Sequence, residues 1–306
     1  MKKIFLISFL LSCFFSFSQS SEKKIAIIPE PVSIQTRTGF MTLPQNIVVA
    51  AKSGEEMKWV TTELINRLRA STGNKISVSS GASNATITLT LNKTKNNELG
   101  NEGYHLSVTQ KNITIQANQP AGLFYGIQTL LQLLPPQIES ATPVQGVKWQ
   151  LPAVEITDYP RFEWRGLMLD VTRHFFTKQD VKHFIDDMVR YKYNILHMHL
   201  TDDEGWRIEI KSLPRLTEVG AWNVKKVGYF GTFSTPTPDE PRDNGGFYTQ
   251  NDIRELVQYA KERFVNILPE IDVPGHSLAA VVSYPEISCT PEANTYRVRS
   301  GEEIMD

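Results

Sequence analysis

The 306-residue sequence has little cysteine and no concentration of basic residues. It contains only Cys13 and Cys289, and Cys13 lies within an apolar N-terminal run. If that run is removed on export, Cys289 has no partner for an intrachain disulfide, and an odd cysteine in an exported protein suggests a missing partner. Lys plus Arg number 32 against 33 Asp plus Glu, and no Lys/Arg stripe is present. The sequence therefore lacks the positive field that a nucleic-acid backbone requires, and we expect no nucleic-acid partner.

The N-terminal apolar run extends from Ile4 to Phe17 and is interrupted mainly by serines. It follows two lysines and precedes small residues, which is typical of a secretory signal cleaved after Ser18. The run falls short of the ~20 apolar residues that a membrane-spanning helix needs, so we expect no stable membrane span. Lipid attachment at Cys13 is an alternative. We predict that residues 1–18 are a signal peptide and that the protein is exported.

No glycine-rich phosphate-binding fingerprint follows any apolar strand, which argues against a dinucleotide-binding fold. Residues 24–156 instead predict a small α+β domain. Alternating apolar residues at 85–91 indicate a strand, and 103–117 indicate a hairpin. Apolar residues at helical spacing indicate helices near 57–68 and 121–134. We find no cluster of titratable residues here and interpret the domain as structural or accessory.

Residues 160–306 show a different pattern, in which apolar strands alternate with amphipathic helices. The expected strands are 166–171, 195–200 and 267–273, and the expected helices are 177–192, with Thr177 and Asp180 as a cap pair, and 249–264, with Thr249 as its cap. Such alternation predicts a parallel sheet covered by helices. An open doubly wound sheet and a (β/α)8 barrel both fit this pattern, and we favour the barrel.

Polar residues follow the predicted strands, at the sheet edge where parallel folds place their chemistry. Arg173, Asp202 and His276 occupy such positions, although Arg173 and Asp202 also fit a surface ion pair. Glu270 and Asp272 share one strand face, and two buried carboxylates need Arg or His partners. We expect His276, at the same strand end, to be one such partner.

His197 and His199 also share one strand face. One interpretation is a pair of hydrogen-bonded histidines that fill a layer of the barrel. The alternative is an H-x-H metal pair of the kind that zinc hydrolases use. No further His or Cys stands at a spacing that would complete the coordination sphere.

Three segments occur in order after the α+β domain: WRGLMLDVTRHFF (164–176), HMHLTDDEGWRIEI (197–210) and PEIDVPGHS (269–277). Together they resemble glycoside hydrolase family 20, the β-N-acetylhexosaminidases. The resemblance implies an accessory domain followed by a (β/α)8 barrel, with an amino-sugar glycan as substrate. It implies that Arg173 and Asp202 bind hydroxyls of the terminal sugar. It also implies that Asp272 and His276 lie beside the catalytic acid, and that no metal or organic cofactor takes part.

The family uses substrate-assisted catalysis, an exception to the two-carboxylate mechanism of most glycosidases. The resemblance implies that the acetamido oxygen of the substrate attacks the anomeric carbon, while an adjacent Asp-Glu pair after strand four orients the acetamide and protonates the leaving oxygen. This chain has no Gly-Asp-Glu element and only about three of the eight strand–helix units. We therefore expect an N-terminal fragment of a longer hexosaminidase, inactive alone, with no catalytic acid pair of its own. The pair is expected to lie beyond Asp306, the last residue of the sequence.

Two other functions fit the same residues. The chain could be an exported protein that binds N-acetylhexosamine without catalysis, using the same sugar-contacting side chains. It could also be a metal-dependent hydrolase built on His197 and His199. Saturable sugar binding by the isolated chain would favour the first, and zinc found by elemental analysis would favour the second.

Overall fold

A computed structural model describes residues 25–299, except 82, 229–233 and 235, together with residues 302–303. The predicted signal peptide, residues 1–18, lies outside the described residues. Asp306 also lies outside them. The expectation that the catalytic acid pair follows Asp306 stays a prediction. Among the helices that the structure describes, none combines the length and the apolar character that crossing a membrane requires.

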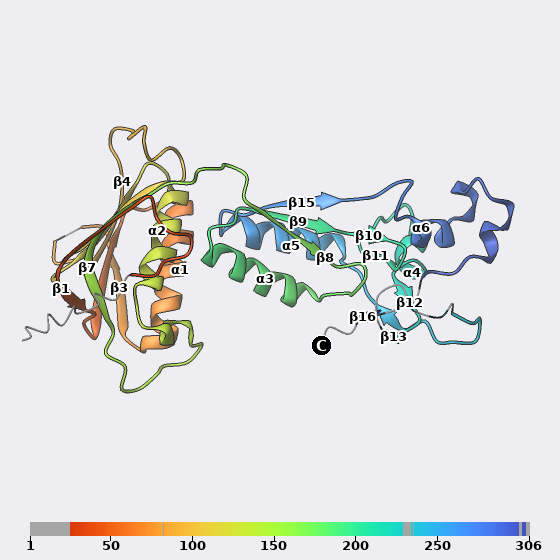
Figure 1. The fold of residues 1–306 in the computed structure, drawn as a ribbon, viewed down its shortest axis with the longest axis horizontal. Coiled ribbons are helices and arrows are strands. Elements are labelled where there is room, and N and C mark those ends of the chain that lie inside the picture. The colour runs from red at the N-terminus through yellow and green to blue at the C-terminus, as the bar shows by residue number, and fades with distance from the viewer. Residues whose placement is uncertain (1–24, 82, 229–233, 235, 300–301, 304–306) are drawn as a thin grey trace, which may run out of the picture.

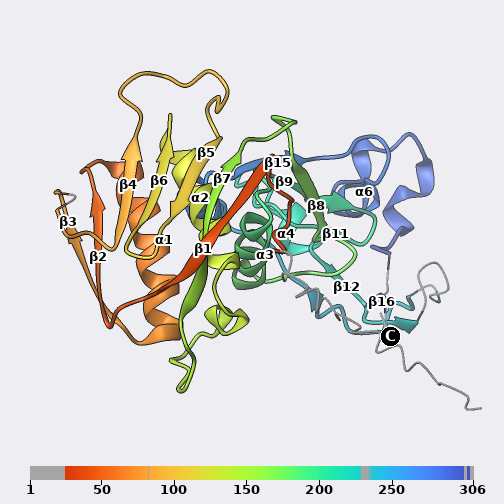
Figure 2. The ribbon, with the colours of Figure 1, turned by 60° about the vertical axis from the view of Figure 1, so that its left-hand side comes forward.

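The first part of the chain is a seven-stranded mixed sheet with two helices on one face (Figures 1 and 2). The strands run in the order β1-β7-β5-β6-β4-β2-β3. Pairs among β1, β7, β5 and β6 are antiparallel, whereas those among β6, β4, β2 and β3 are parallel. The elements are β1 (Ser33–Thr42), β2 (Asn46–Ala51), α1 (Glu55–Thr72), β3 (Lys75–Ser79), β4 (Ile87–Leu91), β5 (Tyr104–Val108), β6 (Ile113–Ala117), α2 (Pro120–Gln132), η1 (Pro136–Glu139) and β7 (Gln150–Asp158).

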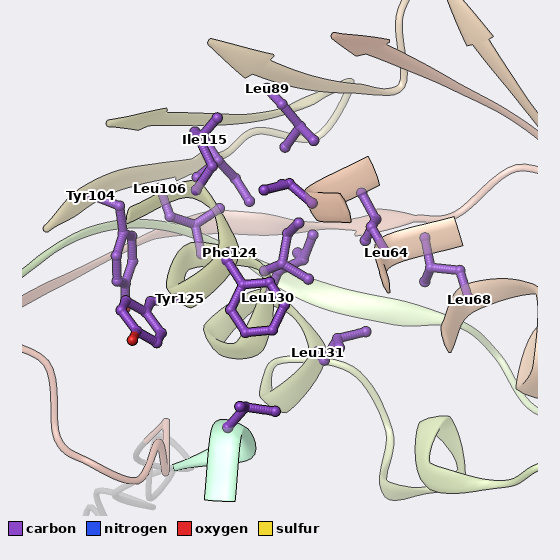
Figure 3. Packing of buried hydrophobic residues seen from close by; sticks show 14 of the residues in the cluster. Leu64, Leu68, Leu89, Tyr104, Leu106, Ile115, Phe124, Tyr125, Leu130 and Leu131 are labelled. Atoms are coloured by element: carbon purple, nitrogen blue, oxygen red, sulfur yellow. The ribbon is translucent and has the colours of Figure 1, made fainter. Parts of the chain in front are cut away.

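The predicted strands, hairpin and helices of this part are confirmed, because their apolar periodicity matches the buried faces. Leu64 of α1, Phe124 of α2 and Ile115 of β6 are fully buried in one packed layer (Figure 3). Helix α1 ends at Gly73, whose φ of 69° is the left-handed conformation that favours glycine after a helix. The α+β character of this part thus follows from local sequence signals.

The second part contains a three-stranded parallel sheet in the order β15-β9-β8, with α3 and α5 packed on one face (Figure 1). Its elements are β8 (Gly166–Asp170), α3 (Lys178–Arg190), β9 (Ile195–His199), β10 (Thr201–Asp202), β11 (Gly205–Trp206), α4 (Arg215–Glu218), β12 (Trp222–Asn223), β13 (Val227–Gly228), β14 (Asn244–Gly245), α5 (Gln250–Lys261), β15 (Asn266–Glu270), α6 (Leu278–Ser283), η2 (Pro285–Ile287), η3 (Pro291–Thr295) and β16 (Glu302–Glu303). The predicted strand, helix, strand order is confirmed. The third strand is shorter than predicted and ends at Glu270.

Both covering helices begin with the predicted caps. The Thr177 and Thr249 hydroxyls each accept a hydrogen bond from the amide three residues later, and the carboxylates of Asp180 and Asp252 bond back to the cap residues. These reciprocal capping boxes satisfy amides that the first helical turn leaves without intrahelical partners. Local sequence therefore sets where α3 and α5 begin.

The two faces of the parallel sheet differ in burial. Leu196 and Met198 of β9 are fully buried beneath the helices. His197 points the opposite way and lies in register with Met168 and Leu268, which are 57% and 41% exposed. The sheet thus has one covered face and one open face, and closure into a (β/α)8 barrel stays a prediction.

The two parts meet through the α1–α2 layer, which lies between the seven-stranded sheet and α3 (Figure 1). A buried polar network lies at this junction. Lys192 Nζ is 2.7 Å from Asp158 Oδ2 and 2.9 Å from the Tyr104 hydroxyl, and that hydroxyl is 2.6 Å from Thr129 Oγ1. Within residues 24–156 themselves, Glu155 lies 3.1 Å from Arg37 Nε and 3.0 Å from His105 Nε2, so the prediction that this domain contains no titratable cluster is wrong. It failed because the three residues come from different strands, which only the folded sheet brings together.

Candidate active site

The carboxyl ends of the three parallel strands place polar side chains at equivalent positions. Asp170 of β8, His199 of β9 and Glu270 of β15 lie in register. Each stands two residues beyond an exposed or half-exposed residue of the open face, so all three belong to that face. Polar side chains therefore gather at the carboxyl ends of the strands, which is the edge where the sequence predicts the candidate residues.

Asp202 is the centre of the site. Its Oδ2 lies 2.6 Å from Arg173 Nη2 and 2.8 Å from His199 Nε2, and its Oδ1 lies 3.0 Å from His276 Nδ1. The Asp203 amide also donates to Oδ1, at 2.6 Å. Asp202 is only 1% exposed, so the surface ion pair considered for Arg173 and Asp202 is wrong. The structure brings Arg173, Asp202 and His276 together around a single carboxylate.

The protonation of this centre is set by its hydrogen bonds. Burial alone would raise the pKa of Asp202, but hydrogen bonds from His199 and the Asp203 amide, with the charge of Arg173, lower it to about 2. The hydrogen bond to Asp202 raises the pKa of His199 to about 9, against the opposing effect of burial. At neutral pH the pair is therefore an aspartate and an imidazolium.

Glu270 joins the two histidines of β9. Its Oε1 lies 2.6 Å from His199 Nδ1, and its Oε2 contacts His197 Nε2. Burial opposes ionisation of Glu270, but the hydrogen bond and charge of His199, with those of His197, lower its pKa. The expectation of an Arg or His partner is confirmed for Glu270, whereas the Asp272 carboxylate has no such partner among the described residues. The partners of Glu270 are the β9 histidines and not His276.

Asp272 lies just beyond the end of β15. Its amide donates to Thr201 Oγ1 at 2.9 Å. The potential ligand atoms of His199, Glu270 and Asp272 lie within 4.8 Å of one another, so this group has the composition of a metal site. Both ring nitrogens of His199 already bond carboxylates, however. We therefore describe the cluster as a hydrogen-bonded network, in line with the first interpretation of the histidine pair.

Three residues of the site were not singled out from the sequence. Asp170 accepts bonds from the Thr172 amide and hydroxyl and lies 2.7 Å from Arg173 Nη1, so it shapes the loop that carries Arg173. The signal for Asp170 was present, because it ends an apolar strand as Glu270 does. Glu204 and Arg207 lie beside the same loop. The pattern of apolar residues around them gives no indication that they are buried.

Arg207 is 1% exposed and supports the loops around the site. Its guanidinium donates to the carbonyl oxygens of Val171, Thr172, Ala221 and Gly246 at 2.6 to 3.1 Å. Burial lowers the pKa of Arg207 to about 10, so it stays charged at neutral pH. One side chain thus ties the segment after β8 to the segments that flank β12 and β14.

Comparison with protein families gives two adjacent matches. Residues 162–305 match the catalytic domain of glycosyl hydrolase family 20, and residues 24–159 match domain 2 of the same family. The chain belongs to glycosyl hydrolase family 20. The resemblance inferred from the three motifs is confirmed.

Family 20 relatives are similar over most of the chain. A beta-hexosaminidase of Porphyromonas gingivalis is 38% identical over 92% of this chain and 34% of its own length. A beta-N-acetylhexosaminidase of Cellulomonas fimi is 34% identical over 92% of this chain and 52% of its own length. The chain thus spans about a third to a half of the length of these curated relatives.

Solved family 20 structures agree with the fold. The Streptomyces plicatus N-acetyl-beta-hexosaminidase in complex with Thio-NAglucal has a TM-score of 0.79 at 37% identity, over 90% of this chain and 51% of that one. A Vibrio harveyi exo beta-N-acetylglucosaminidase in complex with N-acetylglucosamine has a TM-score of 0.72 at 35% identity, over 87% of this chain and 39% of that one. The two-part arrangement of the chain is therefore that of family 20 enzymes.

Proposed function

We propose that this chain is part of a β-N-acetylhexosaminidase that hydrolyses terminal, non-reducing N-acetylhexosamine residues of β-linked glycans. The observation that carries the proposal is the Asp202 carboxylate, which is 1% exposed and binds both Arg173 and His276. A guanidinium fixed in this way offers several donors in a rigid fork, which suits neighbouring sugar hydroxyls. Arg173, Asp202 and His276 are the proposed sugar-binding residues, and Asp272 and His276 are proposed to lie beside the catalytic acid.

The proposed chemistry is retention of configuration by substrate assistance. The acetamido oxygen attacks the anomeric carbon and forms an oxazolinium ring, while a carboxylic acid protonates the leaving oxygen. Water then opens the ring, and the same carboxylate takes its proton. These 306 residues contain no Gly-Asp-Glu element. We propose that the longer protein supplies the acid pair beyond Asp306, from a fourth barrel strand, and that the open face of β8, β9 and β15 is the start of the barrel interior.

Hydrolysis of an aryl N-acetyl-β-glucosaminide tests this function. The complete protein should turn over the substrate, whereas the 306-residue chain should show no turnover. Arg173→Ala in the complete protein should lower kcat/KM roughly hundredfold, because two charged hydrogen bonds to the sugar are lost. Arg254→Ala, on the exposed surface of α5, is the matched control and should leave kcat/KM unchanged.

Other outcomes would point to the alternatives. Sugar binding without turnover by the complete protein would indicate a non-catalytic N-acetylhexosamine-binding protein. Activity that is lost with a chelator and restored by zinc would indicate a metal-dependent hydrolase. Either result would overturn the proposed function.

We also propose that residues 1–18 direct export of the protein. The support is the order of two lysines, an apolar run and small residues. N-terminal sequencing of the mature protein should begin after Ser18. A mature protein that starts at Met1 would contradict this proposal.

A further inference from the structure

Glu204 is buried at a position where a side chain is ordinarily exposed. It lies with Asp203 in the two-residue turn between β10 and β11, yet it is only 3% exposed. The Asn223 side-chain amide donates to the Glu204 carbonyl oxygen at 2.9 Å and is itself buried. The turn is therefore held inward, and the carboxylate of Glu204 is directed into the site.

Two buried polar atoms face each other across this turn. Glu204 Oε2 and Arg173 Nε are both buried, and neither has a hydrogen-bond partner within the described part of the chain. They lie 3.6 Å apart, a few tenths of an ångström beyond a hydrogen bond. A buried charged donor or acceptor left without a partner is unfavourable. A small movement that joins these two atoms would satisfy both.

The other nitrogens of the Arg173 guanidinium are already engaged. Nη1 lies 2.7 Å from Asp170 Oδ2, and Nη2 lies 2.6 Å from Asp202 Oδ2. If Glu204 binds Nε, each of the three guanidinium nitrogens is bound by a carboxylate. One N–H of each Nη then remains for a ligand. Because Glu204 Oε2 is buried, a sugar cannot reach it. Glu204 therefore acts on a bound sugar only through the groups it contacts, and Arg173 is the one of these that we propose to bind the sugar.

We propose that Glu204 is a positioning residue that binds Nε of Arg173 and fixes the plane of the guanidinium that receives the sugar hydroxyls. The identity of the ligand rests on the proposed function, whereas the link between Glu204 and Arg173 does not. An Arg173 held only by Asp170 and Asp202 keeps a free Nε and can tilt. The third carboxylate removes that freedom and prepares the two remaining N–H groups for binding.

The charges around Glu204 make this link sensitive to pH. Asp202 and Asp203 precede Glu204 on its own hairpin, Arg173 faces it from the loop after β8, and Arg299 Nη1 is 3.8 Å from its Oε1. The charge of Arg207, which directly follows the same hairpin, also interacts with Glu204. Burial and the charge of Asp202 raise the pKa of Glu204 to about 7. The charged bond to Arg173 should therefore form as the pH rises through about 7.

NMR of the complete protein without substrate tests the link. The 15Nε–1H resonance of Arg173, assigned with Arg173→Lys, should shift with a midpoint near pH 7 in the wild-type protein. Glu204→Gln keeps an acceptor but cannot ionise, so it should abolish that midpoint. Glu218→Gln, on the exposed surface of α4, is the matched control and should keep it. A resonance that shifts identically in the wild-type and Glu204→Gln proteins would overturn the proposal.

Kinetics of the complete protein then test the consequence for binding. Glu204→Leu should raise KM roughly tenfold with little change in kcat, and Glu204→Gln should restore most of the affinity. An unchanged KM in a folded Glu204→Leu protein would contradict the positioning role. If the wild-type protein does not turn over the substrate while the NMR midpoint is found, the proposed function fails and the Glu204–Arg173 link stands.

Discussion

Asp202 shows how one carboxylate can organise a site from segments far apart in the sequence. Removing a carboxylate from water is unfavourable by several kcal/mol unless hydrogen-bond donors replace the water. Arg173, His199 and His276 supply those donors from the loop after β8, from β9 and from the segment after β15. The burial of Asp202 therefore requires the three segments to converge, and their convergence gives the site its shape.

The pKa of His199 predicts how stability depends on pH. Its folded-state pKa of about 9 lies above the unfolded value of ~6.5, so its contribution is fully present below pH ~6.5 and is lost as the pH rises through about 9. His199→Gln should flatten the decline in the free energy of unfolding over this range. His183→Gln, on the exposed surface of α3, should retain the wild-type slope. Urea unfolding measured from pH 6 to 9 gives this slope, and a His199→Gln slope equal to the wild-type slope would contradict the assignment.

Arg207 predicts a large effect on stability. Arg207→Met would remove a donor from four carbonyl oxygens at a position that is 1% exposed, and of these the Ala221 oxygen keeps the Gly246 amide as a second donor. We expect the free energy of unfolding to fall by about 3 kcal/mol or more, since each unsatisfied buried acceptor is unfavourable by ~1–3 kcal/mol. The exposed control, Arg254→Met, should change it by less than ~0.5 kcal/mol. A loss below ~1 kcal/mol in urea unfolding would show that the loops do not depend on Arg207.

At the scale of elements, the capping boxes of α3 and α5 are the local signals that begin the two covering helices. Thr249→Ala removes the hydroxyl that accepts the Asp252 amide and should lower the free energy of unfolding by ~1 kcal/mol. Thr249→Ser keeps a hydroxyl, so it should lower the free energy of unfolding by less than half as much as Thr249→Ala. Equal losses in the two variants, measured by urea unfolding, would mean that the methyl group matters and the cap does not.

The elements that the sequence predicted correctly are those with strong local signals. The strands β8, β9 and β15 are short apolar runs, and α3 and α5 combine helical spacing with a capping pair. The third strand was predicted too long because Ile271 and Val273 continue the alternation. The structure leaves these two side chains 44% and 72% exposed, beyond the last strand pairing. Alternation alone cannot indicate where a neighbouring strand stops.

The site was predictable in part for the same reason. Arg173, Asp202 and His276 stand at the ends of apolar strands, so the topology of a parallel sheet brings them to one edge. The partners of Glu270 and the burial of Glu204 depend on contacts between segments. Nothing within the hairpin 201–206 distinguishes a buried glutamate from an exposed one. These features could be known only once the segments were placed in space.

At the scale of the whole molecule, the two parts share a buried ion pair. Lys192 and Asp158 lie 2.7 Å apart, and burial lowers the pKa of Lys192 while the charge of Asp158 opposes that effect. Lys192→Met would leave Asp158 as an uncompensated charge and should lower the free energy of unfolding by ~3 kcal/mol. Adding Asp158→Asn should recover part of the loss, because it removes that charge.

A matched control separates this interface from the surface. Lys178 pairs with Asp252 and Glu255 where water is accessible. Lys178→Met should therefore lower the free energy of unfolding by less than ~1 kcal/mol. Both parts should still unfold in a single transition in the control. If Lys192→Met and Lys178→Met have equal effects in urea unfolding, the buried pair does not hold the two parts together.

The most direct test of the proposed sugar site is a crystal structure of the complete protein with N-acetylglucosamine bound. We predict that ring hydroxyls lie about 3 Å from the Nη atoms of Arg173, with Asp202 and His276 at the same end of the sugar. A sugar bound elsewhere, with no contact to Arg173, would contradict the assignment of this site.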